Sequence, residues 1–202
     1  MRFVTFFAVL LCALNVCAGS VQVSDSLKPA DLRVVGSENA PASIYIFTSL
    51  SCPHCAVYHA DVIPALQDEI VAPGLAKLIL VDMPYDARSM MGTMLSRCVT
   101  PAQYDAFLTV VFDNQSMWQN ASTPRPILTG YAKLVGMSDE QINQCLADKN
   151  LQKEIMKQRD NLSNLYGVQG MPSTVVVKNG KHKLLTGTDK ARMIANIKKE
   201  LN

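Results

Sequence analysis

The chain has 202 residues, 49% of them hydrophobic, and a formal net charge of +2. This length suits one domain with an embellishment, and the apolar fraction is sufficient for a buried core. The near balance of charge gives no indication of a nucleic acid or an acidic surface as partner, so we expect no nucleic acid partner.

The first residues have the pattern of an export signal. Arg2 precedes an apolar run over residues 3–16, which ends shortly before small residues suited to cleavage. The run is too short to span a bilayer comfortably, although a retained anchor is the alternative. We therefore predict a signal peptide over residues 1–18 and a mature domain over residues 19–202. Lipidation of Cys17 is a further, minor alternative.

Export changes the number of cysteines that matter. The chain has six cysteines, and cleavage after residue 18 leaves Cys52, Cys55, Cys98 and Cys145. An even number of cysteines in an oxidising compartment suggests two disulfides. Of the three connectivities, geometry favours a local Cys52–Cys55 ring and a distant structural disulfide, Cys98–Cys145.

The first half of the mature chain predicts a strand–helix–strand unit. Alternation and β-branched residues predict three strands, over residues 31–35, 43–48 and 75–81. A helix over residues 53–69 follows Ser51, a suitable N-cap, and Pro64 should kink or split this helix. The strands on either side of the helix form a βαβ unit, so they should be parallel.

A helical insertion is predicted over about residues 85–166. Apolar residues at helical spacing predict helices over residues 86–97, 101–112 and 151–166. Between them lies a polar, proline-bearing break over residues 120–126. Ser138 begins a capping box for one more helix, and Gly167 is a suitable C-cap for the last one.

The end of the chain predicts a hairpin and a helix. Strands are expected over residues 173–178 and 181–186, because Asn179-Gly180 between them is a strong hairpin signal. Thr188 or Asp189 then caps a final amphipathic helix. The chain therefore belongs to the α/β class, with a helical block inserted between its βαβ and ββα parts.

The strongest chemical signal is the sequence Cys52-Pro53-His54-Cys55 at the predicted start of a helix. Two thiols separated by two residues can close into a short disulfide ring and open again. Free N–H groups and the positive end of the helix dipole favour a thiolate at Cys52. Pro53 suits the first helical turn, and His54 can donate a hydrogen bond or carry positive charge near the sulfur. A Cys-x-x-Cys motif near a βαβ unit is typical of a redox site.

The same residues leave a non-enzyme alternative, an exported metal-binding protein. The two thiols with His54 or His59 are suitable zinc or copper ligands, but no second Cys-x-x-Cys supplies more, so we expect no metal. His59 is expected to be a surface or packing residue. Met90, Met91 and Met94 have the helical spacing of core packing, which explains them better than copper binding does.

The Cys-Pro-His-Cys motif, the βαβ start, the helical insertion and Met171-Pro172 before the hairpin together resemble the DsbA family of exported thiol:disulfide oxidoreductases. The match covers nearly all of the mature chain. It implies a thioredoxin fold with an inserted α-helical domain. It also implies that Cys52 is an exposed nucleophile, Cys55 a buried resolving thiol and His54 a thiolate stabiliser. Pro172 would be a cis proline, and Met171 before it would bind substrate.

The resemblance also implies an activity and partners. The protein would be a periplasmic dithiol oxidase that introduces disulfide bonds into unfolded or reduced exported proteins by exchange at Cys52–Cys55. A membrane quinone-linked protein would reoxidise it, and no cofactor is implied. We expect a monomer, because no dimerisation domain is visible before the first strand. The alternative enzyme is a disulfide isomerase or reductase.

Three positions depart from the family pattern. Ile46 occupies a position beneath the active site that often holds an acid. Met171 replaces the more usual Val or Thr, which should alter substrate choice or redox poise. The Cys98–Cys145 pair has this spacing in only a subset of the family. We expect it to be a structural staple, and a second redox site that tunes the first is the alternative.

Overall fold

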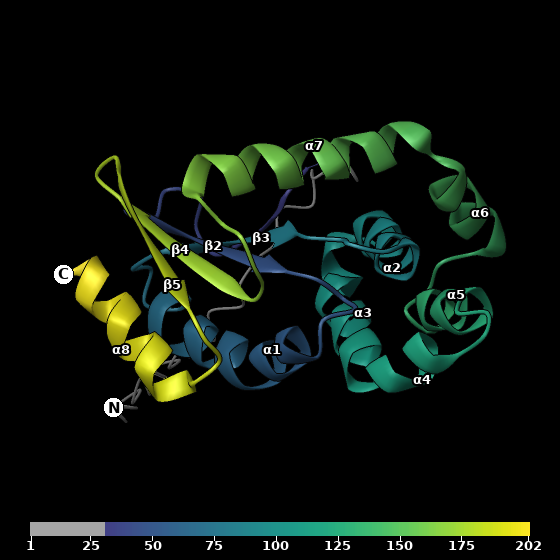
Figure 1. Ribbon diagram of the computed structural model, residues 1–202, viewed down its shortest axis with the longest axis horizontal. Coiled ribbons are helices and arrows are strands. Elements are labelled where there is room, and N and C mark those ends of the chain that lie inside the picture. The colour runs from purple at the N-terminus through teal and green to yellow at the C-terminus, as the bar shows by residue number, and fades with distance from the viewer. Residues whose placement is uncertain (1–30) are drawn as a thin grey trace, which may run out of the picture.

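The computed structural model describes residues 31–202, so the predicted signal peptide over residues 1–18 and Cys17 lie outside the described residues. Five strands form one sheet in the order β1-β3-β2-β4-β5 (Figure 1). Their bounds are β1 Arg33–Val35, β2 Ala42–Thr48, β3 Lys77–Asp82, β4 Ser173–Lys178 and β5 Lys181–Thr186. Within the described residues, no helix is long and apolar enough to cross a membrane.

The strand pairing confirms the βαβ prediction. β2 and β3 are parallel, with Ile44 opposite Leu78, whereas the pairs β1–β3, β2–β4 and β4–β5 are antiparallel. β1 is an edge strand, as its short alternating sequence predicts. The hairpin between β4 and β5 turns at Asn179 and Gly180, both of which have positive φ. The central position of β2 places its carboxyl end, after Thr48, between two neighbouring strands.

Helices cover both faces of the sheet (Figure 1). One face carries α1 (Pro53–Leu66), the π-helical η1 (Gln67–Val71) and α8 (Lys190–Leu201), and the other carries α7 (Lys149–Tyr166). Alternation along β2 divides its side chains between the faces. Ile44 and Ile46 join the large core cluster with α1 and α8, whereas Phe47 joins a smaller cluster with Tyr166 of α7.

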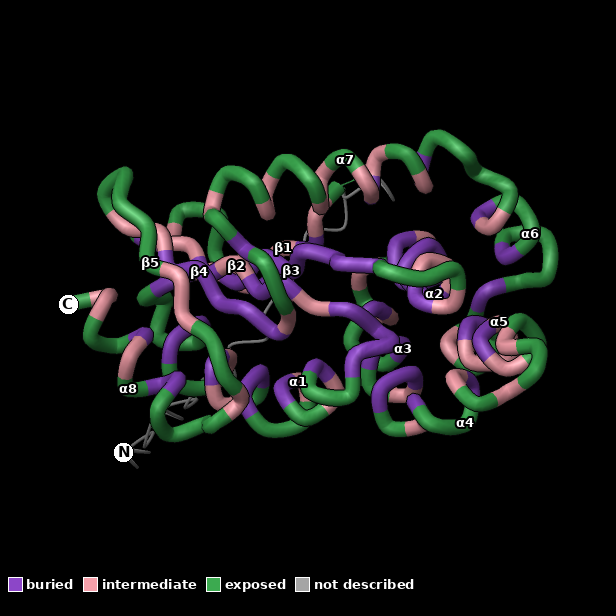
Figure 2. Tube along the Cα trace, in the orientation of Figure 1, coloured by how far each residue is buried: buried purple, intermediate pink, exposed green. Residues whose placement is uncertain are grey.

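The remaining helices lie between β3 and α7. They are α2 Ala87–Cys98, α3 Pro101–Asp113, α4 Gln115–Asn120, α5 Arg125–Leu134 and α6 Asp139–Ala147. They gather at one end of the sheet, beyond the carboxyl ends of β2 and β3 (Figure 1). The sequence predicts α2, α3, α6 and α7 but not α4 or α5. The large core cluster contains residues of the sheet and of these helices, and Figure 2 shows buried segments in both parts.

One local expectation about α1 needs correction. The N-cap is Cys52, with φ −87° and ψ 117°, and not Ser51. The Ser51 hydroxyl instead donates to Asp86 Oδ1 at 3.3 Å, so a long-range contact takes it away from the helix end. Pro64 lies inside α1 without ending it, and the π-type pattern begins three residues later, at Gln67.

Candidate active site

The candidate site begins where β2 ends. Thr48 is the last residue of β2, and the chain turns through residues 49–51 into α1. The Cys52 backbone N–H donates to the Ser49 carbonyl at 3.1 Å, which closes the turn. Pro53 occupies the first helical position, where no N–H donor is needed. The turn therefore places Cys52 at the positive end of α1.

The two cysteines of the motif are free thiols in the structure and both are buried. Cys55 is 0% exposed, as expected of the resolving thiol, but Cys52 is only 8% exposed. The expectation of an exposed nucleophile is therefore wrong for this conformation. The reason is the chain before β4: the Cys52 thiol donates to the Met171 carbonyl oxygen at 3.8 Å, across 119 positions of sequence.

The surroundings of Cys55 favour its protonated form. Burial raises the pKa of the Cys55 thiol to about 12, and the neighbouring Cys52 adds to this rise. Hydrogen bonds from the Ser49 backbone and the Thr48 side chain oppose the rise without cancelling it. Cys55 therefore carries its proton at neutral pH while the ring is open.

The segment before β4 lies beside Cys52. The Met171–Pro172 peptide bond is cis, Pro172 is buried and Met171 is partly exposed. Ser173 begins β4 opposite Phe47 of β2, and this pairing brings residues 171–172 to the end of β2 that carries the motif. The sequence resemblance predicts this arrangement, although no regularity of spacing does.

A groove of about 480 Å³ adjoins this segment. Its lining includes His54, the residues from Gly170 to Ser173, and those from Thr186, the last residue of β5, to Thr188. His54 is exposed, and among the described residues no hydrogen bond joins it to Cys52. The position of His54 is therefore at the rim of a groove, and its role as a thiolate stabiliser stays a prediction.

Side chains from the helical segment hold the turn that carries Cys52. Gln115 Nε2 donates to the carbonyl oxygens of Leu50 and Cys52, at 2.6 and 3.1 Å. The Tyr85 hydroxyl donates to the Ser51 carbonyl at 2.9 Å. Sequence reasoning missed Gln115 and Tyr85, because neither belongs to a motif and both reach the turn only through tertiary packing.

Ile46 and His59 lie beneath the motif, in the lining of a small cavity that Cys55 also lines. Ile46 is 1% exposed, so the position beneath the active site is apolar in this chain. His59 stacks on Phe112 with 4.7 Å between ring centroids. Burial lowers the pKa of His59, although the charge of Asp113 opposes this. His59 therefore packs as a neutral ring.

The other two cysteines among the described residues are joined. Cys98 at the end of α2 and Cys145 in α6 form a disulfide, with 6.1 Å between their Cα atoms. This is the pairing that the sequence predicts, and it ties together two helices of the inserted segment. Its role as a structural staple stays a prediction, and a second redox site that tunes the first pair is the alternative. In residues 31–202, no group of three or more His, Cys, Asp or Glu side chains is placed to hold a metal ion.

Comparison with known proteins finds a matching family model and relatives that are named for disulfide chemistry. A family model described as thioredoxin matches residues 29–196. A Rickettsia felis protein named as a candidate protein-disulfide oxidoreductase is 23% identical over 164 residues, which cover 78% of this chain and 59% of that protein. A Bacillus cereus protein named as a candidate disulfide bond formation protein D is 26% identical, over 72% of this chain and 69% of that protein. The chain thus spans less than two thirds of the Rickettsia relative.

Solved structures show the same fold. Alpha-DsbA1 from Wolbachia pipientis superposes with a TM-score of 0.75 at 24% identity, covering 85% of this chain and 90% of that one. Oxidised BdbD from Bacillus subtilis has a TM-score of 0.69 at 23% identity, covering 90% and 97%. The match over residues 29–196 shows that the chain belongs to the thioredoxin family, and its fold is the DsbA-type thioredoxin fold with an inserted α-helical domain.

Proposed function

We propose that this protein is a thiol:disulfide oxidoreductase that introduces disulfide bonds into exported proteins by exchange at Cys52–Cys55. The observation that carries the proposal is the placement of two free thiols at the start of α1, one of them facing the Met171 carbonyl. Thiolates at such positions are favoured as nucleophiles and as leaving groups in disulfide exchange. Relatives named for disulfide formation support the same type of reaction.

The proposed reaction moves two electrons from the client to the protein. A client thiolate attacks the Cys52 sulfur of the oxidised pair, the Cys52–Cys55 bond breaks, and the Cys55 sulfur leaves with the electron pair and takes up a proton. A second client thiolate then attacks the client sulfur of the mixed disulfide. The Cys52 sulfur leaves, and the client keeps the new disulfide.

The environment of Cys55 bears on the second step of this reaction. Because the pKa of Cys55 is raised to about 12, the departing sulfur is protonated at neutral pH and does not readily attack the mixed disulfide again. The second step is then left to the client thiol. We assign substrate binding to Met171 and Pro172, whose segment lies beside Cys52, and assign to His54 a position at the rim of the adjoining groove.

The cellular setting belongs to the same proposal. Residues 1–18 would direct export and be removed, and the mature protein would act in the periplasm as a monomer. Its clients would be unfolded or reduced exported proteins, and a membrane quinone-linked protein would reoxidise it. Mass spectrometry of the exported protein checks the processing step, with residue 19 expected as the new N-terminus.

Equilibration with glutathione buffers tests the direction of catalysis. We expect a strongly oxidising poise for the Cys52–Cys55 pair and oxidation of a reduced, unfolded secreted protein by the wild type but not by Cys52→Ser. Cys98→Ser with Cys145→Ser is the control that keeps the motif intact, and it should retain the reaction. A poise as reducing as that of a cytosolic thioredoxin would instead identify a reductase or isomerase.

A further inference from the structure

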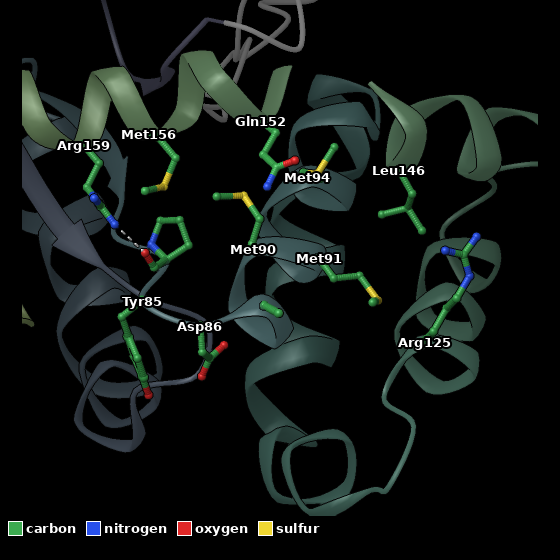
Figure 3. Close-up of a pocket in the computed structure, with 12 residues that line it drawn as sticks. Tyr85, Asp86, Met90, Met91, Met94, Arg125, Leu146, Gln152, Met156 and Arg159 are labelled. Carbon is green, nitrogen blue, oxygen red and sulfur yellow. Dashed lines mark hydrogen bonds between the residues drawn. The ribbon is translucent and has the colours of Figure 1, made fainter. Parts of the chain in front are cut away.

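A second hollow of about 470 Å³ lies between the loop after β3 and helices α2, α5, α6 and α7. Four methionines line it: Met90, Met91 and Met94 from α2, and Met156 from α7. We call it the methionine pocket. Figure 3 shows the side chains of Met90 and Met156 extending into the same space from opposite sides. It shares no lining residue with the groove beside Pro172.

Core packing does not bury all four methionines of this pocket. Met94 is 4% exposed and belongs to the core, whereas Met90, Met91 and Met156 stay partly exposed. Met90 and Met94 are four positions apart, so they share a face of α2 that looks onto the pocket. A flexible, polarisable thioether surface of this kind adapts to apolar groups of different shapes.

The pocket is continuous with the turn that carries Cys52. Tyr85 and Asp86 line it, and both are hydrogen-bonded to Ser51. The Tyr85 hydroxyl donates to the Ser51 carbonyl, and the Ser51 hydroxyl donates to Asp86 Oδ1. Since Ser51 precedes Cys52, a chain that is joined to Cys52 reaches the pocket within a few residues, at roughly 3.3–3.6 Å per extended residue.

The charges that line the pocket are of both signs: Asp86 lies where the pocket meets the turn of Cys52, and Arg125 and Arg159 lie elsewhere in the lining. Arg159 is already paired with Asp160 at 2.7 Å and donates to the Pro84 carbonyl. Arg125 is exposed and donates to the neutral side-chain oxygen of Asn143 at 3.2 Å. The charge of Arg125 is therefore available to a carboxylate on a bound chain (Figure 3).

We propose that the methionine pocket binds an apolar side chain of the unfolded client, a few residues from the client cysteine that reacts at Cys52. Arg125 further favours clients with an acidic residue beside that side chain. The inference rests on the proposed function and adds a docking site to it. An unfolded client fits the pocket because it exposes apolar side chains near its cysteines and because its sequence varies, which the thioethers accommodate.

The test compares thiols that differ only in what the pocket can hold. The oxidised full-length protein is mixed in a stopped-flow instrument with glutathione, or with cysteine peptides that carry Leu or Asn at two to six residues from the cysteine. We expect the best Leu peptide to react about tenfold faster than its Asn partner, as burial of a few methylenes allows. Met90→Gln with Met156→Gln should remove this preference and leave the glutathione rate unchanged.

Matched controls separate docking from general damage. Met117→Gln changes a methionine of α4 that is 59% exposed and outside the pocket, so it should preserve the preference. Arg125→Gln should remove a preference for Asp over Lys beside the Leu, whereas Arg192→Gln on α8 should not. Equal rates for Leu and Asn peptides with the wild type would overturn the inference. Equal slowing of peptide and glutathione in the double variant would overturn it too, whereas failure of the wild type with every thiol would overturn the proposed function itself.

Discussion

Two sulfurs one helical turn apart lie in different surroundings. Cys52 keeps 8% of its surface exposed and contacts the Met171 carbonyl, whereas Cys55 is fully enclosed and its pKa is raised by burial to about 12. One thiol of the pair can therefore meet a client after a small displacement of the covering segment. The other stays protonated until a sulfur reaches it from within the site.

This difference predicts how the buried thiol reacts. In the Cys52→Ala variant, Cys55 should be alkylated by iodoacetamide at pH 8 about a hundredfold more slowly than a free thiol, because burial, the largest cause of its raised pKa, remains when Cys52 is removed. Its rate should still be rising above pH 9. Unfolding in urea should restore ordinary reactivity, and fast alkylation of the folded variant at pH 8 would contradict the assignment.

A buried ion pair gives a second prediction at this scale. Arg97 Nε lies 2.6 Å from Asp82 Oδ2, and their side chains are 1% and 7% exposed. Asp82→Ala should cost about 3–5 kcal/mol in the free energy of unfolding, because it leaves a guanidinium buried without its carboxylate. Asp139→Ala breaks an exposed pair with Lys133 and should cost about 1 kcal/mol or less. Urea denaturation of both variants measures the difference, and similar costs would refute it.

The residues of the motif could be predicted from the sequence, but the residues that pack over Cys52 and hold its turn could not. Spacing and helix position identify Cys52 and Cys55, and the cysteine count identifies Cys98 and Cys145 as the other pair. The burial of Cys52 comes from Met171, 119 positions away, and the turn is held by Gln115, whose residue type carries no signal. Such contacts depend on how distant elements pack, which local patterns do not encode.

At the scale of elements, the sequence predicts what has a period or a turn signal. The strands of the sheet, the Asn179-Gly180 hairpin and the capping box at Ser138 were found in this way, and the structure confirms them. α5 was missed because Pro124 and Pro126 suggest a break. In the structure these prolines lie at the N-cap and in the first turn of α5, where the missing N–H does no harm.

Two glycines of the helical segment should respond oppositely to alanine. Gly167 ends α7 with φ +67°, a conformation that costs an alanine about 1–2 kcal/mol, so Gly167→Ala should destabilise the protein by that amount. Gly130 lies inside α5, with no heavy atom within 4 Å of an added Cβ. Gly130→Ala should stabilise by about 0.5–1 kcal/mol. Thermal or urea unfolding measures both, and the same sign for the two would contradict this account.

At the scale of the whole molecule, the inserted helices are not an independent unit. One apolar cluster contains Ile44 of β2, Trp118 of α4 and Ile142 of α6, all nearly or fully buried. Gln115 of α4 and Tyr85 of the loop before α2 add hydrogen bonds to the turn that carries Cys52. The apolar core and the candidate site are both built from residues of the sheet and of the inserted helices. Unfolding of the helices would therefore expose core residues of the sheet, and unfolding of the sheet would expose those of the helices.

We therefore expect the sheet and the inserted helices to unfold in a single transition. Trp118 is the chain's one tryptophan, it is fully buried, and its Nε1 donates to the Val111 carbonyl, so its fluorescence reports on the helical segment. Amide hydrogen exchange of β2, at Ile44 and Ile46, reports on the sheet. In urea, the fluorescence midpoint and the midpoint for loss of β2 protection should coincide. Loss of the Trp118 signal at clearly lower urea, with β2 still protected, would show instead that the helices open as a separate unit around a stable sheet.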